Sequence, residues 1–205
     1  MRYIERYHPK EGDGHNKILV ITGVPAVGKD YLLSESKRLG MIPPSVRSFS
    51  FGEELFVFLR TLYPQVKTRD DIRTLLSQDV IRAAVEGIIF RMIQAQPSML
   101  NTHVVYRQKD SIVTNPDLDK RIHPHSYLFV WSEPDQIAKW RSLDTSRTRP
   151  TESVTNIALH QDIALEVVSV VARHTGASLK TVWNRADNTQ ENLVLIQEKV
   201  HEITL

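Results

Sequence analysis

The stretch GVPAVGKD, residues 23–30, carries the residue types and spacing best suited to chemistry in this chain. Glycines at 23 and 28 permit backbone conformations that a side chain would penalise, so the N–H groups between them can turn inward around a chain of phosphates. The Lys29 ammonium can then reach the outer phosphates. We predict an ATP site here, with a glycine-rich turn that only caps a helix as the alternative. Its expected contacts are Gly23, Val24, Pro25, Ala26, Val27, Gly28, Lys29, Asp30 and Tyr31.

Asp30 departs from the usual pattern, in which a serine or threonine hydroxyl follows the lysine and ligates the Mg²⁺ of the nucleotide. One interpretation is that Asp30 only caps the helix that follows, because a carboxylate is favoured at a helix N-terminus. The other is that Asp30 replaces the hydroxyl as the Mg²⁺ ligand. Mg²⁺ is commonly held by one or two carboxylates together with substrate phosphates. We favour replacement.

The elements around this loop fit the requirement for phosphate binding. Residues 18–21 form a continuous apolar run, which is typical of a strand buried on both faces. A helical pattern follows from Lys29 to Leu39 and ends near Gly40. A strand before the loop and a helix after it would aim the positive end of the helix at the phosphates.

The rest of the chain alternates strand and helix patterns, which predicts right-handed crossovers and a parallel sheet. The expected fold is a three-layer α/β sandwich, with a five-stranded parallel sheet and helices on both faces. After a polar arm at 1–16, residues 17–205 would form a single domain. Further strands are expected at 46–51, 98–105, 127–131 and 179–183, and helices at 53–62, 69–96, 133–144, 154–175 and 189–203, with a polar loop between 105 and 127.

Composition limits the classes of partner. The 205 residues are 41% hydrophobic and carry a net charge of +2 with no long run of Lys or Arg, so no nucleic-acid surface is predicted. The absence of cysteine excludes thiolate nucleophiles. No run of 18 apolar residues and no apolar leader occur, so we expect no membrane association and a cytoplasmic location. The oligomeric state is left open.

Six further motifs occur in a fixed order along the chain. With the loop in place, this set resembles the archaeal-type adenylate kinases, a branch of the P-loop nucleoside monophosphate kinases, from about residue 17 to 200. The resemblance implies the P-loop NTPase fold, ATP and Mg²⁺ as cofactors, and reversible transfer of a phosphoryl group from ATP to a nucleoside monophosphate, with AMP favoured. The motifs are FGEELF at 51–56, RDDIRTL at 69–75, NTH at 101–103, DTSRTR at 144–149, TGA at 175–177 and NRAD at 184–187.

The resemblance also implies an acceptor site within about 51–96, extended by one residue of the NTH motif. Phe51 would offer a stacking surface and Gly52 would let the nucleotide approach closely. The two arginines lie four apart, hence on one helix face, and would hold the acceptor phosphate. Alternatives remain, because aromatic residues at such spacing are usually core and the arginines can pair with the aspartates between them. The acceptor residues are Phe51, Gly52, Arg69, Arg73 and His103.

On the donor side, the resemblance implies a short lid at about 141–152 that closes over the ATP phosphates. Three arginines there, Arg141, Arg147 and Arg149, would stabilise the charge of the transferring group. Arg185 and Ala186 match the place where the family holds the donor adenine. A polar strand-to-helix turn explains these last two residues equally well.

Asn101 is the second departure, because the family usually has an aspartate there, near the metal and phosphates. A carboxylate is thus gained at Asp30 and lost at Asn101, and our hypothesis is that the metal-supporting charge has moved, with Asn101 supporting the metal indirectly. Two other functions stay open. The chain can be a kinase for another nucleotide or a small phosphorylated metabolite, or an ATP-binding regulatory or assembly protein with weakened catalysis. Stimulation by an acceptor separates these readings.

Overall fold

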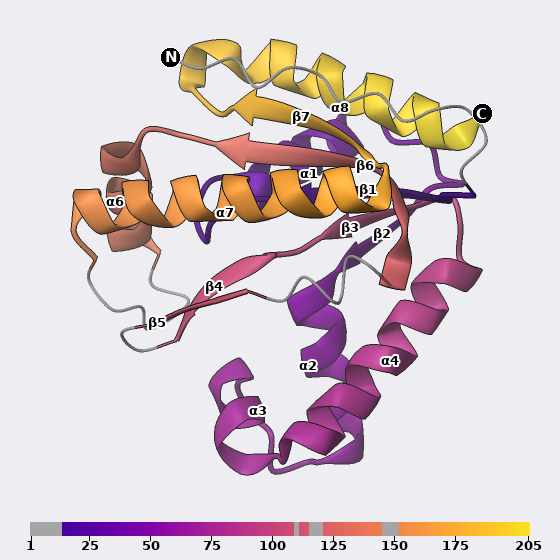
Figure 1. Cartoon of the computed structure of the whole chain (residues 1–205), viewed down its shortest axis with the longest axis vertical. Coiled ribbons are helices and arrows are strands. Elements are labelled where there is room, and N and C mark those ends of the chain that lie inside the picture. Colours follow the sequence, from indigo (N-terminus) through magenta and orange to yellow (C-terminus); the bar gives the residue numbers. More distant parts are fainter. Residues whose placement is uncertain (1–13, 109–110, 115–120, 145–151) are drawn as a thin grey trace.

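The computed structural model describes residues 14–108, 111–114, 121–144 and 152–205. Five parallel strands form its central sheet in the order β2-β3-β1-β6-β7 (Figure 1). The predicted α/β class and the five-stranded parallel sheet are therefore confirmed. The strands are β1 (Asn16–Thr22), β2 (Arg47–Ser50), β3 (Ser98–Asn101), β6 (Pro124–Trp131) and β7 (Ser178–Trp183).

Helices cover both faces of this sheet. The connection from β1 to β2 and the connection from β6 to β7 run in opposite directions across the sheet, so right-handed crossovers place α1 and α7 on opposite faces. Helix α8 packs against α1 and β1, whereas α7 packs against β6 and β7 (Figure 1). The helices are α1 (Lys29–Arg38), α2 (Phe51–Leu62), α3 (Arg69–Leu75), α4 (Gln78–Gln94), α6 (Pro134–Leu143), α7 (Val154–Thr175) and α8 (Thr189–Thr204), with a 3₁₀ turn η1 (Ala186–Asn188).

The core is centred on β1 and β6. Ile18, Leu19 and Val20 are wholly buried, as the apolar run predicts for a strand covered on both faces. Because the chain leaves β1 and β6 in opposite directions, a crevice opens at the carboxyl ends of these strands. This is the position of residues 23–30, which we call the phosphate loop.

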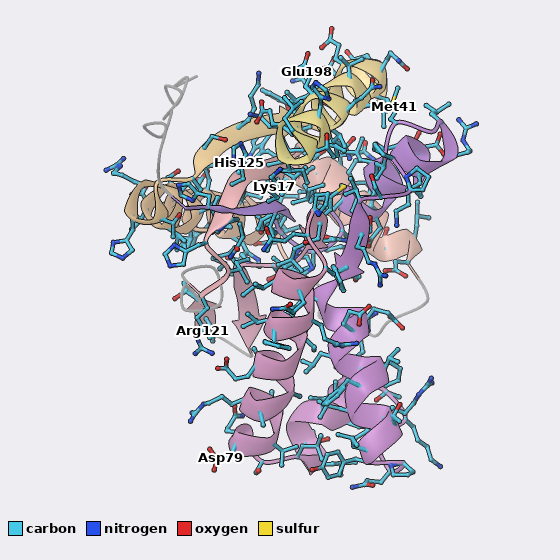
Figure 2. All side chains as sticks on the ribbon, turned by 90° about the vertical axis from the view of Figure 1, so that its right-hand side faces the viewer. Lys17, Met41, Asp79, Arg121, His125 and Glu198 are labelled. Atoms are coloured by element: carbon cyan, nitrogen blue, oxygen red, sulfur yellow. The ribbon has the colours of Figure 1, made fainter. Side chains whose placement is uncertain are left out.

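Helices α2, α3 and α4 form a unit that projects from the sheet (Figure 1). Figure 2 shows Asp79, in the first turn of α4, at the end of this unit far from the sheet. A small apolar cluster of its own holds the unit together. Its buried members are Leu59, Val66, Ile72 and Ala84.

The prediction of a single helix at 69–96 is wrong, because the structure has two helices there. Leu76 is extended, with φ −113° and ψ 145°, and separates α3 from α4. The Ser77 hydroxyl accepts a hydrogen bond from the Val80 N–H and so begins a new helix. The apolar spacing continues through the break, which is why the pattern did not reveal it.

The prediction of a single strand at 98–105 is also wrong for the second half of that range. β3 ends at Asn101, and Val105 begins a separate strand, β4 (Val105–Gln108), which pairs antiparallel with β5 (Ser111–Thr114). Part of the stretch expected as a loop is therefore a two-stranded hairpin. Phe51, expected as the last strand residue, is the first residue of α2.

Helix α7 is, within the described ranges, the one helix long and apolar enough to span a membrane by length and composition. Its apolar stripe includes Ile157, Val168 and Val171, which are buried. Because α7 packs against β6 and β7, this stripe lies in the core, whereas Val154, Leu159 and Val170 of the same helix are exposed.

Candidate active site

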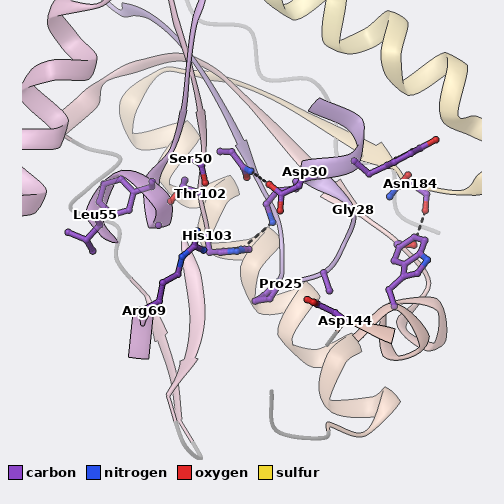
Figure 3. Close-up of a pocket in the computed structure, with 18 of the residues that line it drawn as sticks. Pro25, Gly28, Asp30, Ser50, Leu55, Arg69, Thr102, His103, Asp144 and Asn184 are labelled. Carbon is purple, nitrogen blue, oxygen red and sulfur yellow. Dashed lines mark hydrogen bonds between the residues drawn. The ribbon is translucent and has the colours of Figure 1, made fainter. Parts of the chain in front are cut away.

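A cavity of about 1180 Å³ lies at the carboxyl ends of the strands (Figure 3). Each strand supplies lining residues at or just beyond its end, because parallel strands end at one edge of the sheet. The cavity runs from the phosphate loop to the unit of α2, α3 and α4. The lining residues at the strand ends are Ser50, Asn101, Thr102, Ser132 and Asn184, with Pro25, Ala26, Gly28 and Lys29 from the loop that follows β1.

The phosphate loop requires glycine at both predicted positions. Gly23 has φ 148° and Gly28 has φ 91°, in the left-handed region that side chains avoid. Space is lacking too, since a Cβ on Gly23 would collide with the Val130 carbonyl and one on Gly28 with the Asn184 amide. That amide also donates to the Val27 carbonyl at 2.8 Å. The end of β7 therefore holds the loop from outside.

Lys29 is only 5% exposed and is folded back on the loop. Its Nζ lies 3.0 Å from the Gly23 carbonyl oxygen, 3.2 Å from that of Val24 and 3.2 Å from Nδ1 of His103. His103 Nδ1 is also 2.6 Å from the Gly23 oxygen. His103, assigned to the acceptor site from the sequence, thus lines the cavity beside the lysine. Phosphate oxygens could replace these carbonyls as partners of the ammonium.

Asp30 and Asn101, the two departures from the family pattern, are brought into contact. Asn101 Nδ2 donates to Asp30 Oδ1 at 2.5 Å, because β3 is the neighbour of β1 and ends beside the first turn of α1. The N-cap of α1 is Gly28, without a side-chain cap. The Asp30 carboxylate lines the cavity instead (Figure 3).

These residues fit Mg²⁺ bound together with a nucleotide. Across residues 14–108, 111–114, 121–144 and 152–205, no group of three or more His, Cys, Asp or Glu could hold a metal alone. One carboxylate completed by phosphates and water is a common way of holding Mg²⁺. Asp30, oriented by the Asn101 amide, would provide that carboxylate.

The far side of the cavity is formed by the α2–α4 unit. Phe51 lines the cavity and also packs against the main core, so the two readings of this residue are compatible. Arg69 lines it as well and forms an ion pair with Glu53. Its Nη1 lies 3.5 Å from the place of a Cβ on Gly52. The side chain of Arg73 is outside the described part. Other lining residues are Leu55, Ile72, Gln78, Ile81 and Val85.

The side of the cavity next to α6 and the end of β7 contains an aromatic residue that was not predicted. Trp140 of α6 lines the cavity, and its ring lies 4.0 Å from the place of a Cβ on Gly28. Arg185 lines it too, with its guanidinium 3.9 Å from the Trp183 ring centroid and Nη2 3.1 Å from Glu133. Ala186 begins η1, and its side chain is not described.

Arg141, predicted from the sequence as a catalytic arginine, lies beside the phosphate loop. It is not among the described residues that line the cavity. Its Nε and Nη2 donate to the Pro25 carbonyl at 3.2 and 3.1 Å, and its Nη1 pairs with Glu152. Arg147 and Arg149 lie outside the described residues.

The glycine loop and buried lysine, set at the carboxyl ends of a five-stranded parallel sheet, define a phosphotransferase with the P-loop kinase fold. Solved shikimate kinases share the fold. The enzyme from Acinetobacter baumannii, solved with shikimate, has a TM-score of 0.53 and 14% identity over 91% of this chain and 95% of that one. The enzyme from Bacteroides thetaiotaomicron has a TM-score of 0.52 and 14% identity over 90% of this chain and 98% of that one.

The chain is homologous to archaeal adenylate kinases along most of its length, which confirms the resemblance seen in the motifs. It is 27% identical to the adenylate kinase of Thermococcus kodakarensis over 192 residues, covering 92% of this chain and 96% of that protein. It is 28% identical to the adenylate kinase of Methanoculleus marisnigri over 187 residues, covering 88% of this chain and 93% of that protein. It is 26% identical to the adenylate kinase of Methanothermobacter thermautotrophicus over 194 residues, covering 91% of this chain and all of that protein. No family model matches the chain.

Proposed function

We propose that the chain transfers the γ-phosphoryl group of ATP reversibly to a nucleoside monophosphate, with AMP as the favoured acceptor and ADP as both products. The observation that carries this proposal is one continuous cavity, lined by the phosphate loop on one side and by Phe51 and Arg69 on the other. Its volume of about 1180 Å³ exceeds the roughly 300–1000 Å³ of a typical site for one small ligand. Two substrates can therefore meet within it.

On the donor side, the N–H groups of the phosphate loop would bind the ATP phosphates. Lys29 would exchange the Gly23 and Val24 carbonyls for phosphate oxygens and stabilise charge during transfer. Arg185 would contact the adenine. Arg147, Arg149 and Ala186 keep their predicted roles within this proposal, with a lid at about 141–152.

On the acceptor side, Arg69 would exchange Glu53 for the phosphate of AMP and hold it in line with the γ-phosphoryl group. Arg73 would assist, and Phe51 and Gly52 would hold the nucleoside. The acceptor phosphate is already anionic at neutral pH, so no strong general base is needed. This is why positioning and charge stabilisation suffice for the reaction.

Asp30 would hold Mg²⁺ together with the ATP phosphates, and the Asn101 amide would orient its carboxylate. When bound, Mg²⁺ supplies neutralisation of the phosphate charge. We further propose a cytoplasmic location, in keeping with water-soluble nucleotides as substrates, and a single domain over 17–205 with an acceptor-binding excursion at about 51–96.

The test is ADP production from ATP and Mg²⁺, with and without a panel of acceptors headed by AMP, and the reverse reaction from ADP alone. We expect AMP to stimulate turnover strongly and ADP to be converted to ATP and AMP. If another member of the panel stimulates turnover more than AMP does, that compound replaces AMP as the proposed acceptor. If no acceptor stimulates turnover, the proposal is wrong and an ATP-binding regulatory role is favoured.

A pair of lysines on α1 supplies a matched comparison. Lys29→Ala removes the ammonium in the cavity and should lower kcat by about 10²–10³-fold, the size of effect seen when one group that stabilises transition-state charge is lost. Lys37→Ala, on the exposed last turn of the same helix, should leave kcat unchanged. Equal effects of the two substitutions would contradict the role of Lys29.

A further inference from the structure

Two residues that flank 145–151 form a nearly buried ion pair. Arg141 lies in the last turn of α6, and Glu152 comes just before Ser153, the N-cap of α7. Their side chains are only 10% and 8% exposed. A charge pair so far removed from water must be well matched, because a buried charge without its partner is costly.

The Arg141 guanidinium contacts two partners at once. Nε and Nη2 donate to the Pro25 carbonyl, and Nη1 pairs with Glu152. A planar guanidinium presents its donors in a rigid fork, so fixing one side by a carboxylate also fixes what the other side can hold. Glu152 therefore sets the position of the donors that hold Pro25.

The held carbonyl belongs to the phosphate loop itself. In a trans peptide, C=O and N–H point in opposite directions, so a Pro25 carbonyl turned to Arg141 turns the Ala26 N–H the other way. Pro25 and Ala26 both line the cavity. Ala26 also has φ 65°, a left-handed conformation that is uncommon for a residue with a side chain and so needs support from outside.

We propose that Glu152, acting through Arg141, is a positioning residue that keeps the Pro25–Ala26 peptide oriented with its N–H toward the phosphates of ATP. This rests on the proposed function for the identity of the donor. It differs from the role expected for Arg141 as a direct contact of the transferring group. Without Glu152, the guanidinium is no longer fixed, the Pro25 carbonyl is free to rotate, and one donor to the phosphates is lost.

The first experiment measures the Kd of ATP and of AMP separately, by calorimetry, for the wild type and for Glu152→Gln. Gln keeps the shape of the side chain and removes its charge. We expect the Kd of ATP to rise roughly 10-fold, since a hydrogen bond to a charged phosphate is lost, and the Kd of AMP to stay unchanged. Glu152→Asp, which keeps the charge, should restore part of the ATP affinity.

A second variant and a matched control complete the test. Arg141→Lys keeps a positive charge but cannot hold both partners. It should therefore also raise the Kd of ATP and leave the Kd of AMP unchanged. Glu86→Gln removes the partner of Arg121 in an exposed ion pair, neither member of which is among the described residues that line the cavity, and should change neither affinity. The amide resonance of Ala26 should shift in Glu152→Gln relative to the wild type.

The outcomes separate this inference from the proposed function, because binding of ATP alone requires no acceptor. ATP affinity that is lost selectively supports the positioning role even if AMP never stimulates turnover. Folded Glu152→Gln or Arg141→Lys protein that binds ATP as tightly as the wild type overturns it. Parallel loss of ATP and AMP affinity also overturns it, since that marks a general structural role, and a wild type that does not bind ATP overturns both proposals.

Discussion

At the scale of single residues, Asp30 and Asn101 act on each other directly. An asparagine amide can donate to a carboxylate, as Asn101 does to Asp30 at 2.5 Å, whereas an aspartate at position 101 could not. Gaining a carboxylate at 30 and losing one at 101 are thus complementary changes. This contact supports the hypothesis that the metal-supporting charge has moved to the first turn of α1.

The contact predicts the behaviour of Asn101→Asp. Two carboxylates at hydrogen-bonding distance repel, at a cost of roughly 1 kcal/mol in a solvent-exposed setting, so the melting temperature should fall by about 2–4 °C. Millimolar Mg²⁺ should reverse the loss, because a cation between the carboxylates removes the repulsion. Thermal unfolding with Mg²⁺ and with EDTA measures both effects.

The control for this prediction is Gln65→Glu, which adds a negative charge at an exposed position between α2 and α3. Its melting temperature should respond to Mg²⁺ as the wild type does. If Mg²⁺ stabilises Asn101→Asp no more than it stabilises Gln65→Glu, then Asp30 and position 101 do not form a cation site.

The phosphate loop could be predicted at this scale because its determinants are local. Glycine at 23 and 28 is required by the φ angles of those residues, and the lysine follows directly. Glu152 and Trp140 could not be predicted in the same way. Their places depend on contacts between distant parts of the chain, such as that of Arg141 with Pro25, 116 positions earlier in the sequence.

At the scale of elements, the boundary between α3 and α4 shows how periodicity can mislead. Leu76, Val80 and Ala84 keep a four-residue spacing across the break, so the apolar pattern alone predicts one long helix. The capping signals were present in the sequence. Thr68 and Asp71 form a capping box for α3, and Ser77 caps α4, but a serine inside an apolar periodic segment does not by itself distinguish a cap from a helix interior.

The break leads to a prediction about Ser77. Ser77→Ala removes the acceptor for the Val80 N–H and should lower the free energy of unfolding by about 1 kcal/mol. Ser77→Asp keeps an acceptor and places a negative charge at the positive end of α4, so it should retain the wild-type stability. Urea unfolding of the three proteins provides the measurement. Equal midpoints for Ser77→Ala and the wild type would show that the cap does not stabilise α4.

At the scale of the whole molecule, the layers could be predicted but the cavity could not. Alternating strand and helix patterns and right-handed crossovers dictate a covered parallel sheet, and each of the five expected strands contributes a strand to the central sheet, although the hairpin of β4 and β5 was not expected. The distance between the α2–α4 unit and the phosphate loop, which sets the size of the cavity, could not be predicted in this way. It depends on how α2 packs against α4 and on where Arg69 meets Glu53, and no spacing in the sequence encodes either contact.

The proposal that one cavity binds two nucleotides makes a prediction about linked ligands. Two adenosines joined by five phosphates would occupy the donor and acceptor sides together, and the second contact would become intramolecular. The Kd of this ligand should therefore be at least about 10²-fold lower than that of ATP, with one ligand bound per chain. Two adenosines joined by only two phosphates cannot span both sides and should bind no more tightly than ATP. Calorimetry gives affinity and stoichiometry in one titration, and two long ligands per chain, or no gain over ATP, would contradict a cavity that the two substrates share.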